Sequence, residues 1–170
     1  QIALNHRPHA VCLVPERREE RTTEGGLTVI GKGNWMTPYV ARLTDAGIRV
    51  SIFIEPDPAQ LAAARAIGAP VVELHTGAYA HATGEGVARE TERLRQGARA
   101  AADLGLECHA GHGLTFDNVG PVAAIPNVVE LNIGHFLVGE AIFSGLDSAI
   151  RRMRAAMDRA RAEALGAKSA

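Results

Sequence analysis

The residues best suited to chemistry are histidines that follow short apolar runs. Residues 110–115 read Ala-Gly-His-Gly-Leu-Thr, directly after the run Leu106–Ala110. Flanking glycines let the backbone turn sharply and approach a ligand closely. A histidine exchanges protons near neutral pH, so His112 is predicted to act as a general acid or base. The alternative is a glycine turn that carries an incidental histidine.

A second histidine motif, Asn132-Ile133-Gly134-His135, ends the last apolar run of the chain. A helical segment is expected to begin near Phe136. Free N–H groups at the start of a helix bind phosphate. Gly134 and His135 are therefore predicted to bind a phosphoryl group, although a simple turn between strand and helix is the alternative.

Two further titratable residues, Glu73 and His75, are spaced two apart in the run Val71–His75. In a strand this spacing places both side chains on one face. Burying such groups is costly unless they have a partner or a task. Glu73 is predicted to bind substrate hydroxyl or amine groups. A structural hydrogen bond between Glu73 and His75 is the competing interpretation.

The segment Glu16–Gly26 is a charged loop that ends in two glycines. It is long for a connection between a strand and a helix. Such loops often close over a substrate, and the hydroxyl of Thr22 or Thr23 could bind a phosphate or a ketone. An ordinary solvated surface loop would show the same composition.

The elements that must position these residues alternate between short apolar runs and longer helical patterns. This alternation predicts a parallel sheet with right-handed crossovers. Strands are expected at Ala10–Val14, Ile48–Ile54, Val71–His75, Leu106–Ala110 and Val128–Ile133. Helices are expected at residues 36–46, Pro58–Ile67, Glu85–Leu104, Asn118–Ala124 and Ser144–Ala164.

Polar residues collect at the carboxyl end of every predicted strand. This favours a closed (β/α)8 TIM barrel, whose strand ends meet at one mouth, over an open doubly wound sheet, whose ligand residues cluster at one switch point. A complete barrel has eight strands and typically about 250 residues. Residues 1–170 are thus expected to form a single domain, the five C-terminal units of a barrel, with about three units preceding Gln1.

Composition excludes several classes of function. Apolar residues make up 46% and charged residues 22% of the chain, and the net charge is −1. A nucleic-acid surface would need a basic excess, and no apolar stretch is long enough for a membrane span. Cys12 and Cys108 are expected to be buried, reduced thiols. No metal is expected, because no histidine or cysteine spacing is typical of zinc. The cytoplasm is the expected compartment.

Five segments of the chain resemble the pyridoxine 5'-phosphate synthase family, whose members close the pyridine ring of vitamin B6. They are LVPERREERTTEGGL (13–27), SIFIEPD (51–57), ELHTGAYA (73–80), AGHGLTFDNV (110–119) and ELNIGH (130–135). The resemblance implies condensation of 1-deoxy-D-xylulose 5-phosphate with 3-amino-2-oxopropyl phosphate, releasing water and phosphate. It implies no organic cofactor or metal, and it implies a homo-oligomer.

The resemblance also implies roles for individual residues. His112 matches the family's proton donor, and Gly113 matches a residue that contacts substrate. Thr22 matches a substrate-binding threonine, while Gly134 and His135 match a phosphate-binding pair. The family's first three strands carry further substrate-binding and basic residues that are not matched here, so this chain alone is expected not to turn over.

Two other functions remain open from the residues. The first is another phosphate-binding barrel, such as a phosphosugar isomerase or aldolase. A Schiff-base aldolase needs a lysine at a strand end, and the only lysines are Lys32 and Lys168. The second is a non-catalytic barrel fragment that binds phosphorylated ligands.

Overall fold

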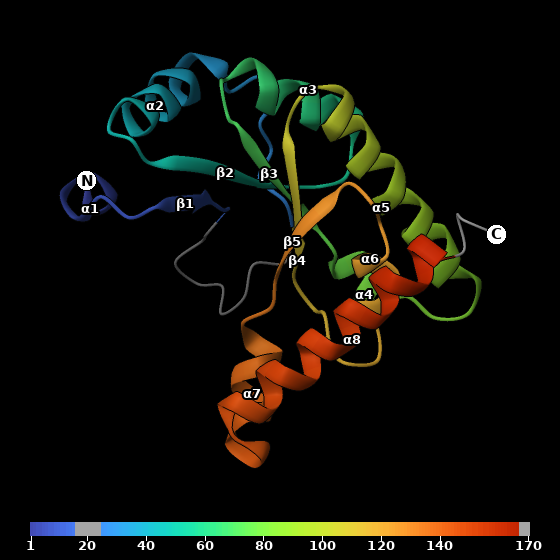
Figure 1. Cartoon of the computed structure of the whole chain (residues 1–170). Helices are drawn as coiled ribbons and strands as arrows, with labels where there is room; N and C mark the ends of the chain where they lie inside the picture. The colour runs from blue at the N-terminus through green and yellow to red at the C-terminus, as the bar shows by residue number, and fades with distance from the viewer. Residues whose placement is uncertain (16–24, 167–170) are drawn as a thin grey trace.

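The computed structural model describes residues 1–15 and 25–166. Its centre is a sheet of five parallel strands that lie side by side in sequence order (Figure 1). The strands are β1 (Ala10–Leu13), β2 (Arg49–Ile54), β3 (Val71–His75), β4 (Glu107–Gly111) and β5 (Val128–Asn132). The predicted strands are therefore confirmed, and no bound differs by more than one residue.

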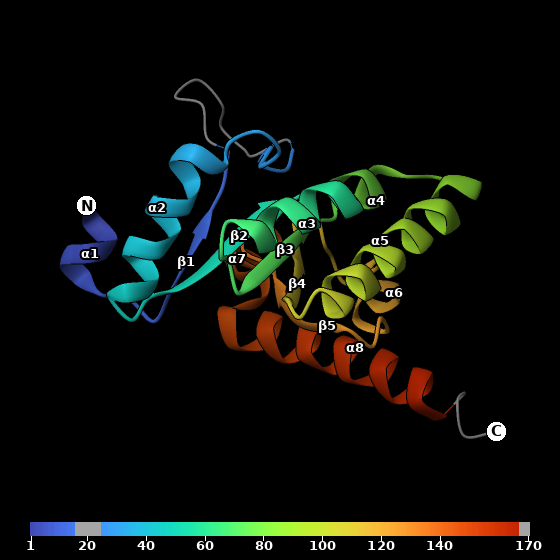
Figure 2. The same cartoon turned by 90° about the horizontal axis from the view of Figure 1, so that it is seen from above.

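Helices connect successive strands (Figure 2). Their bounds are α1 (Ile2–His6), α2 (Gly33–Asp45), α3 (Pro58–Ala66), α4 (Gly77–His81), α5 (Glu85–Asp103), α6 (Val119–Ala123), α7 (His135–Ser144) and α8 (Leu146–Gly166). The start of α3 shows how local sequence sets a boundary. The Asp57 carboxylate accepts a hydrogen bond of 2.8 Å from the Ala59 amide, and Pro58 occupies the first turn, where its missing N–H costs nothing.

The two faces of the sheet differ in polarity. Ile52, Ile54 and Leu74 point to the helix-covered face and are 0% exposed, and they form one apolar cluster with residues of α2, α3 and α5. Their neighbours Ser51 and Glu73 point to the opposite face, because side chains alternate along a strand. The hydrophobic core thus lies between the sheet and its helices, and the other face is polar.

This arrangement bears on the choice between barrel and open sheet. A doubly wound sheet reverses its strand order at a switch point, whereas the order here is β1-β2-β3-β4-β5 without reversal. The chain therefore has an α/β fold with five parallel strands in one sheet, as a partial TIM barrel would.

The prediction that both cysteines are buried is wrong for Cys12. Cys108 is buried in the core, but Cys12 is exposed. The reason is its place on the edge strand: Cys12 lies beside Ser51 on the polar face, but β1 has a neighbouring strand on one side only.

The patterns of the sequence do not predict α1 or α4. Both are five residues long, too short to show a helical period. Within the part of the chain that the structure describes, no helix is both long and apolar enough to cross a bilayer.

Gly97 packs closely against the residues beneath α5. A Cβ at this position would lie 2.7 Å from Pro56 Cβ and 3.5 Å from Leu74 Cδ1. Gly97→Ala is therefore expected to lower the Tm by about 3–8 °C, even though alanine favours helix. Thermal unfolding followed by circular dichroism measures the change.

Gly86→Ala is the matched control in the same helix. Its added Cβ would meet Ala82 Cβ at an ordinary 3.6 Å, so the Tm should stay constant or rise. Equal Tm changes in the two variants would contradict the close packing at Gly97.

Candidate active site

A cavity of about 970 Å³ opens at the carboxyl ends of β2 to β5. Its walls include five of the six residues predicted to form a site: Glu73, His112, Gly113, Gly134 and His135. The sixth, Thr22, lies outside the described residues. Residues far apart in sequence, such as Val14 and Phe136, thus line one space because parallel strands end at the same edge.

His112 is held in an unusual backbone conformation just after β4. Its φ is 88°, a region that residues other than glycine rarely adopt. The buried hydroxyl of Thr76 lies 2.7 Å from the Gly111 carbonyl oxygen and 2.5 Å from that of His112, and the Thr76 amide donates to Gly111 at 2.9 Å. The next residue, Gly113, also has a positive φ. Thr76 therefore fixes the turn that directs His112 to the cavity wall.

The second motif forms the first turn of α7. The helix begins at His135 with Gly134 as its N-cap, and no side chain caps it. The first N–H groups of a helix have no partner within the helix. Since Gly134, His135 and Phe136 all line the cavity, this end of α7 offers donors suited to an anion.

An aromatic contact supports that end of α7. The Phe136 ring meets Phe116 edge to face, with centroids 4.8 Å apart. The guanidinium of Arg152 in α8 lies 4.0 Å above the Phe116 ring. The loop after β4 is thereby packed against the start of α7 and against α8, which keeps the two histidine motifs close together.

Glu73 and His75 share the cavity, but each has another partner. Glu73 accepts a long hydrogen bond of 3.5 Å from the Cys12 thiol, while His75 Nδ1 lies 2.6 Å from Glu55 Oε1. The alternative of a structural Glu73–His75 hydrogen bond is therefore wrong. Glu73 is 9% exposed, and this burial raises its carboxyl pKa.

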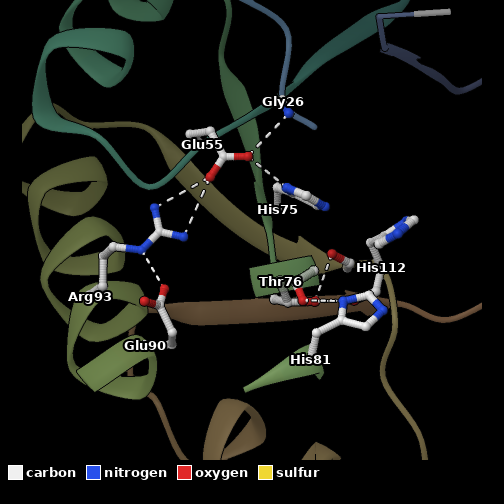
Figure 3. A network of polar contacts seen from close by, with 10 residues as sticks. Gly26, Glu55, His75, Thr76, His81, Glu90, Arg93 and His112 are labelled. Carbon is white, nitrogen blue, oxygen red and sulfur yellow. Dashed lines mark hydrogen bonds and ion pairs between the residues drawn. The ribbon is translucent and has the colours of Figure 1, made fainter. Parts of the chain in front are cut away.

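Glu55 is the centre of a polar network that joins four elements (Figure 3). Besides His75, its carboxylate accepts from the Gly26 amide at 3.2 Å and from the Arg93 guanidinium at 3.3 and 3.4 Å. Arg93 also donates to Glu90 at 2.7 Å. The hydrogen bond from His75 is the main cause that lowers the pKa of Glu55 to about 2, so this carboxylate is ionised near neutral pH.

Three residues of this region are not among the predicted site residues: Glu55, Arg93 and His81. Glu55 directly follows β2, and polar residues at the carboxyl ends of strands meet at the mouth of a barrel, so its position also points to the site. No motif of the sequence points to His81. It lies on the cavity wall, with Nδ1 2.8 Å from the Gly77 carbonyl oxygen. Its place depends on α4, a helix that the sequence patterns do not predict.

Among residues 1–15 and 25–166, no group of three or more histidine, cysteine, aspartate or glutamate side chains could hold a metal ion. The buried histidine outside the cavity, His109, has both ring nitrogens near carboxylates, at 2.8 Å from Glu107 and 3.3 Å from Glu130.

Comparison with known proteins decides the family. The model of the family described as "Pyridoxal phosphate biosynthesis protein PdxJ" matches residues 1–159. The chain belongs to this family. PdxJ relatives include the pyridoxine 5'-phosphate synthase of Rhodospirillum rubrum, 66% identical over 161 residues, and that of Zymomonas mobilis, 61% identical over 163 residues.

These PdxJ relatives are longer than the chain. The matches cover 94% and 96% of this chain but 64% of each relative, so the chain spans just under two thirds of their length. Among solved structures, a xylose isomerase domain protein from Planctomyces limnophilus is similar, with a TM-score of 0.57 over 93% of this chain and 64% of that one. At 17% identity, this likeness concerns the fold alone.

Glu55 gives a pH-dependent contribution to stability. Because its pKa is about 2 when folded and 4.5 when unperturbed, folding favours the ionised form. The contribution is therefore complete above pH 4.5 and is lost as the pH falls towards about 2. Glu55→Gln is expected to flatten the decline of the unfolding free energy over this window, as measured by urea unfolding at a series of pH values.

Asp147→Asn serves as the control, because Asp147 pairs with Arg151 on the surface and its side chain is 79% exposed. This variant should keep the wild-type acid dependence. If Glu55→Gln also keeps it, the Glu55 network does not contribute to stability as described.

Proposed function

We propose that this chain supplies part of the active site of a pyridoxine 5'-phosphate synthase. In this reaction the amine of 3-amino-2-oxopropyl phosphate condenses with the ketone of 1-deoxy-D-xylulose 5-phosphate to give an imine. Loss of water and of one phosphate, followed by ring closure, gives pyridoxine 5'-phosphate. The observation that carries the proposal is that His112 and the start of α7 line one cavity in a chain of the PdxJ family.

Phosphate recognition is assigned to Gly134 and His135. Both substrates carry a phosphoryl group, and the residues at the start of α7 line the cavity at the positive end of the helix dipole. Gly134 suits this role because it has no Cβ and the space beside its backbone is open: no atom lies within 4 Å of the position that a Cβ would occupy. A phosphoryl oxygen can therefore approach the backbone closely.

Proton donation is assigned to His112. Imine formation expels a hydroxyl group as water, and this leaving group needs a proton in the transition state. The His112 ring lines the cavity, and its backbone is fixed by Thr76. Gly113 lies beside the ring and would contact substrate through its backbone.

Glu73 and Thr22 complete the proposed set. A buried carboxylate at the cavity wall suits hydrogen bonding to a substrate hydroxyl or amine, or to positive charge that develops at the imine nitrogen. Thr22 would bind substrate through its hydroxyl, as the family resemblance implies. No organic cofactor or metal is needed for these steps.

The proposal extends to the whole protein. The five strands would belong to an eight-stranded barrel, with about three further strand–helix units that carry additional substrate-binding and basic groups. The relatives' greater length supports this extension. The enzyme would work in the cytoplasm on its two phosphorylated substrates, release inorganic phosphate, and form a homo-oligomer.

Replacing His112 tests the proposed function. In the enzyme that carries this chain within a complete barrel, His112→Gln is expected to lower kcat by about 10²-fold or more, with a smaller change in KM, because proton donation acts in the transition state. The assay measures pyridoxine 5'-phosphate formed from the two substrates. His6→Gln, on exposed α1, is the control with wild-type turnover; full turnover by His112→Gln would overturn the assignment.

Glu73→Gln separates function from stability. Burial raises the pKa of Glu73, so its ionised form is costly and a neutral isostere should leave the Tm at pH 8 unchanged or higher. Turnover should nevertheless fall about tenfold or more, since a developing charge loses its partner. Glu92→Gln, on an exposed part of α5, should change neither. A lower Tm with normal turnover would mean that Glu73 is structural.

A further inference from the structure

A line of three polar side chains runs along the cavity wall from β2 to β4: Glu55, His75 and His112 (Figure 3). Glu55 contacts His75, as described above, and the ring of His75 meets that of His112 with centroids 5.0 Å apart and planes at 63°. Neither Glu55 nor His75 has a role in the proposed function. Both residues nevertheless lie directly behind His112, the proposed proton donor.

The contact between His75 Nδ1 and Glu55 shows which ring nitrogen of His75 carries the proton. Glu55 is ionised near neutral pH, so its oxygen can only accept, and Nδ1 of His75 must be the donor. A neutral His75 ring then leaves the lone pair on Nε2. This nitrogen is buried and has no hydrogen-bond partner among the described residues, although the residue as a whole is 6% exposed and lines the cavity.

The unpartnered nitrogen lies on the side of His75 that faces His112. A Cβ added at Gly77 would lie 2.4 Å from His75 Nε2 and 3.2 Å from His112 Cδ2. Gly77 thus keeps the space between the two rings free of a side chain. The negative end of the His75 ring, with the Glu55 charge behind it, is directed at the neighbourhood of His112.

The surroundings hold His75 in place and bury its ring. Phe53 is 4% exposed and packs edge to face on His75, with centroids 5.1 Å apart. Arg93 and the Gly26 amide hold the Glu55 carboxylate from the other side. Because His75 itself is 6% exposed, the electrostatic effect of its ring on a neighbouring ring is screened less than at a surface, although the Glu55 side chain behind it is 38% exposed.

We propose, on the basis of the proposed function, that Glu55 and His75 are positioning residues that orient the His112 ring and favour its protonated form. A proton donor must carry its proton at the working pH, and a lone pair backed by a carboxylate stabilises a nearby imidazolium. The other titratable groups that share the cavity with His112 are Glu73, His81 and His135, while Arg93 lies behind Glu55.

The first experiment is carried out on the full chain without substrate. Two-dimensional 15N spectra of the histidine rings report which nitrogen carries the proton and the pH at which each ring is half protonated. Wild-type His75 is expected to carry its proton on Nδ1. Glu55→Gln and His75→Phe are each expected to lower the half-protonation pH of His112 by about half a unit or more.

Two further variants sharpen this measurement. Gly77→Ala inserts a methyl group between the rings and should alter the His112 titration while Glu55 and His75 are both present. Arg151→Gln removes a comparable but exposed ion pair and should leave the titration unchanged. Glu55→Gln is isosteric and keeps the side-chain shape, so its result can be read even if His75→Phe fails to fold.

The histidine titrations test the proposal without any measurement of turnover. A His112 titration that is the same in wild type, Glu55→Gln and His75→Phe overturns the proposal, as does a His75 proton found on Nε2. A purely structural pair would lower the Tm without moving this titration.

Turnover in the complete enzyme separates this proposal from the proposed function. Glu55→Gln should lower kcat about tenfold with little change in KM, and the alkaline limb of the kcat profile should move to lower pH. If the titration shifts but wild type makes no pyridoxine 5'-phosphate, the proposed function fails and the electrostatic coupling stands.

Discussion

The in-order parallel pairing of the five strands is the constraint from which the site follows. The register pairs Ile54 with Leu74, and His75 with Gly111, while Gly111 pairs with Asn132. The residues that follow each pair, among them Glu55, His112 and Gly134, must then lie along one rim. Because side chains alternate, a slip of one residue in any pair would turn the polar set into the apolar core. Burial of the apolar side chains therefore fixes the register of the strands, and this register brings the site residues together.

The polar face of the sheet carries buried polar groups, some with hydrogen-bond partners and some without. Carboxylates face both ring nitrogens of His109, so the cost of burying these polar atoms is offset locally. Glu73, which pairs with His109 in the register, has a raised pKa because of its burial. At the rim, His75 Nε2 is buried and has no partner among the described residues. A perturbed carboxyl and an unpartnered nitrogen on the wall of one cavity are expected of a site that a ligand completes.

Much of the fold and of the candidate site could be predicted from the sequence, and the features that could not be predicted share one cause. Apolar runs and glycine stops predict the five strands, and the glycines around His112 predict a turn at a strand end. Strand parity correctly places Glu73 and His75 on one face, but it does not say which neighbour each will contact: Glu55 comes from the adjacent strand and Arg93 from a helix 38 residues further along. The exposure of Cys12 and the position of His81 likewise depend on packing between distant segments. Thr22 lies outside the described residues, so its role stays a prediction.

A crystal structure of the complete enzyme with bound pyridoxine 5'-phosphate would test the central claim most directly. The account predicts that the phosphoryl oxygens lie within about 3 Å of the backbone N–H groups at the start of α7, and that the pyridine ring lies against His112 with Glu73 on the opposite wall. A product bound elsewhere, or one whose phosphate avoids Gly134 and His135, would contradict the assignment of this cavity.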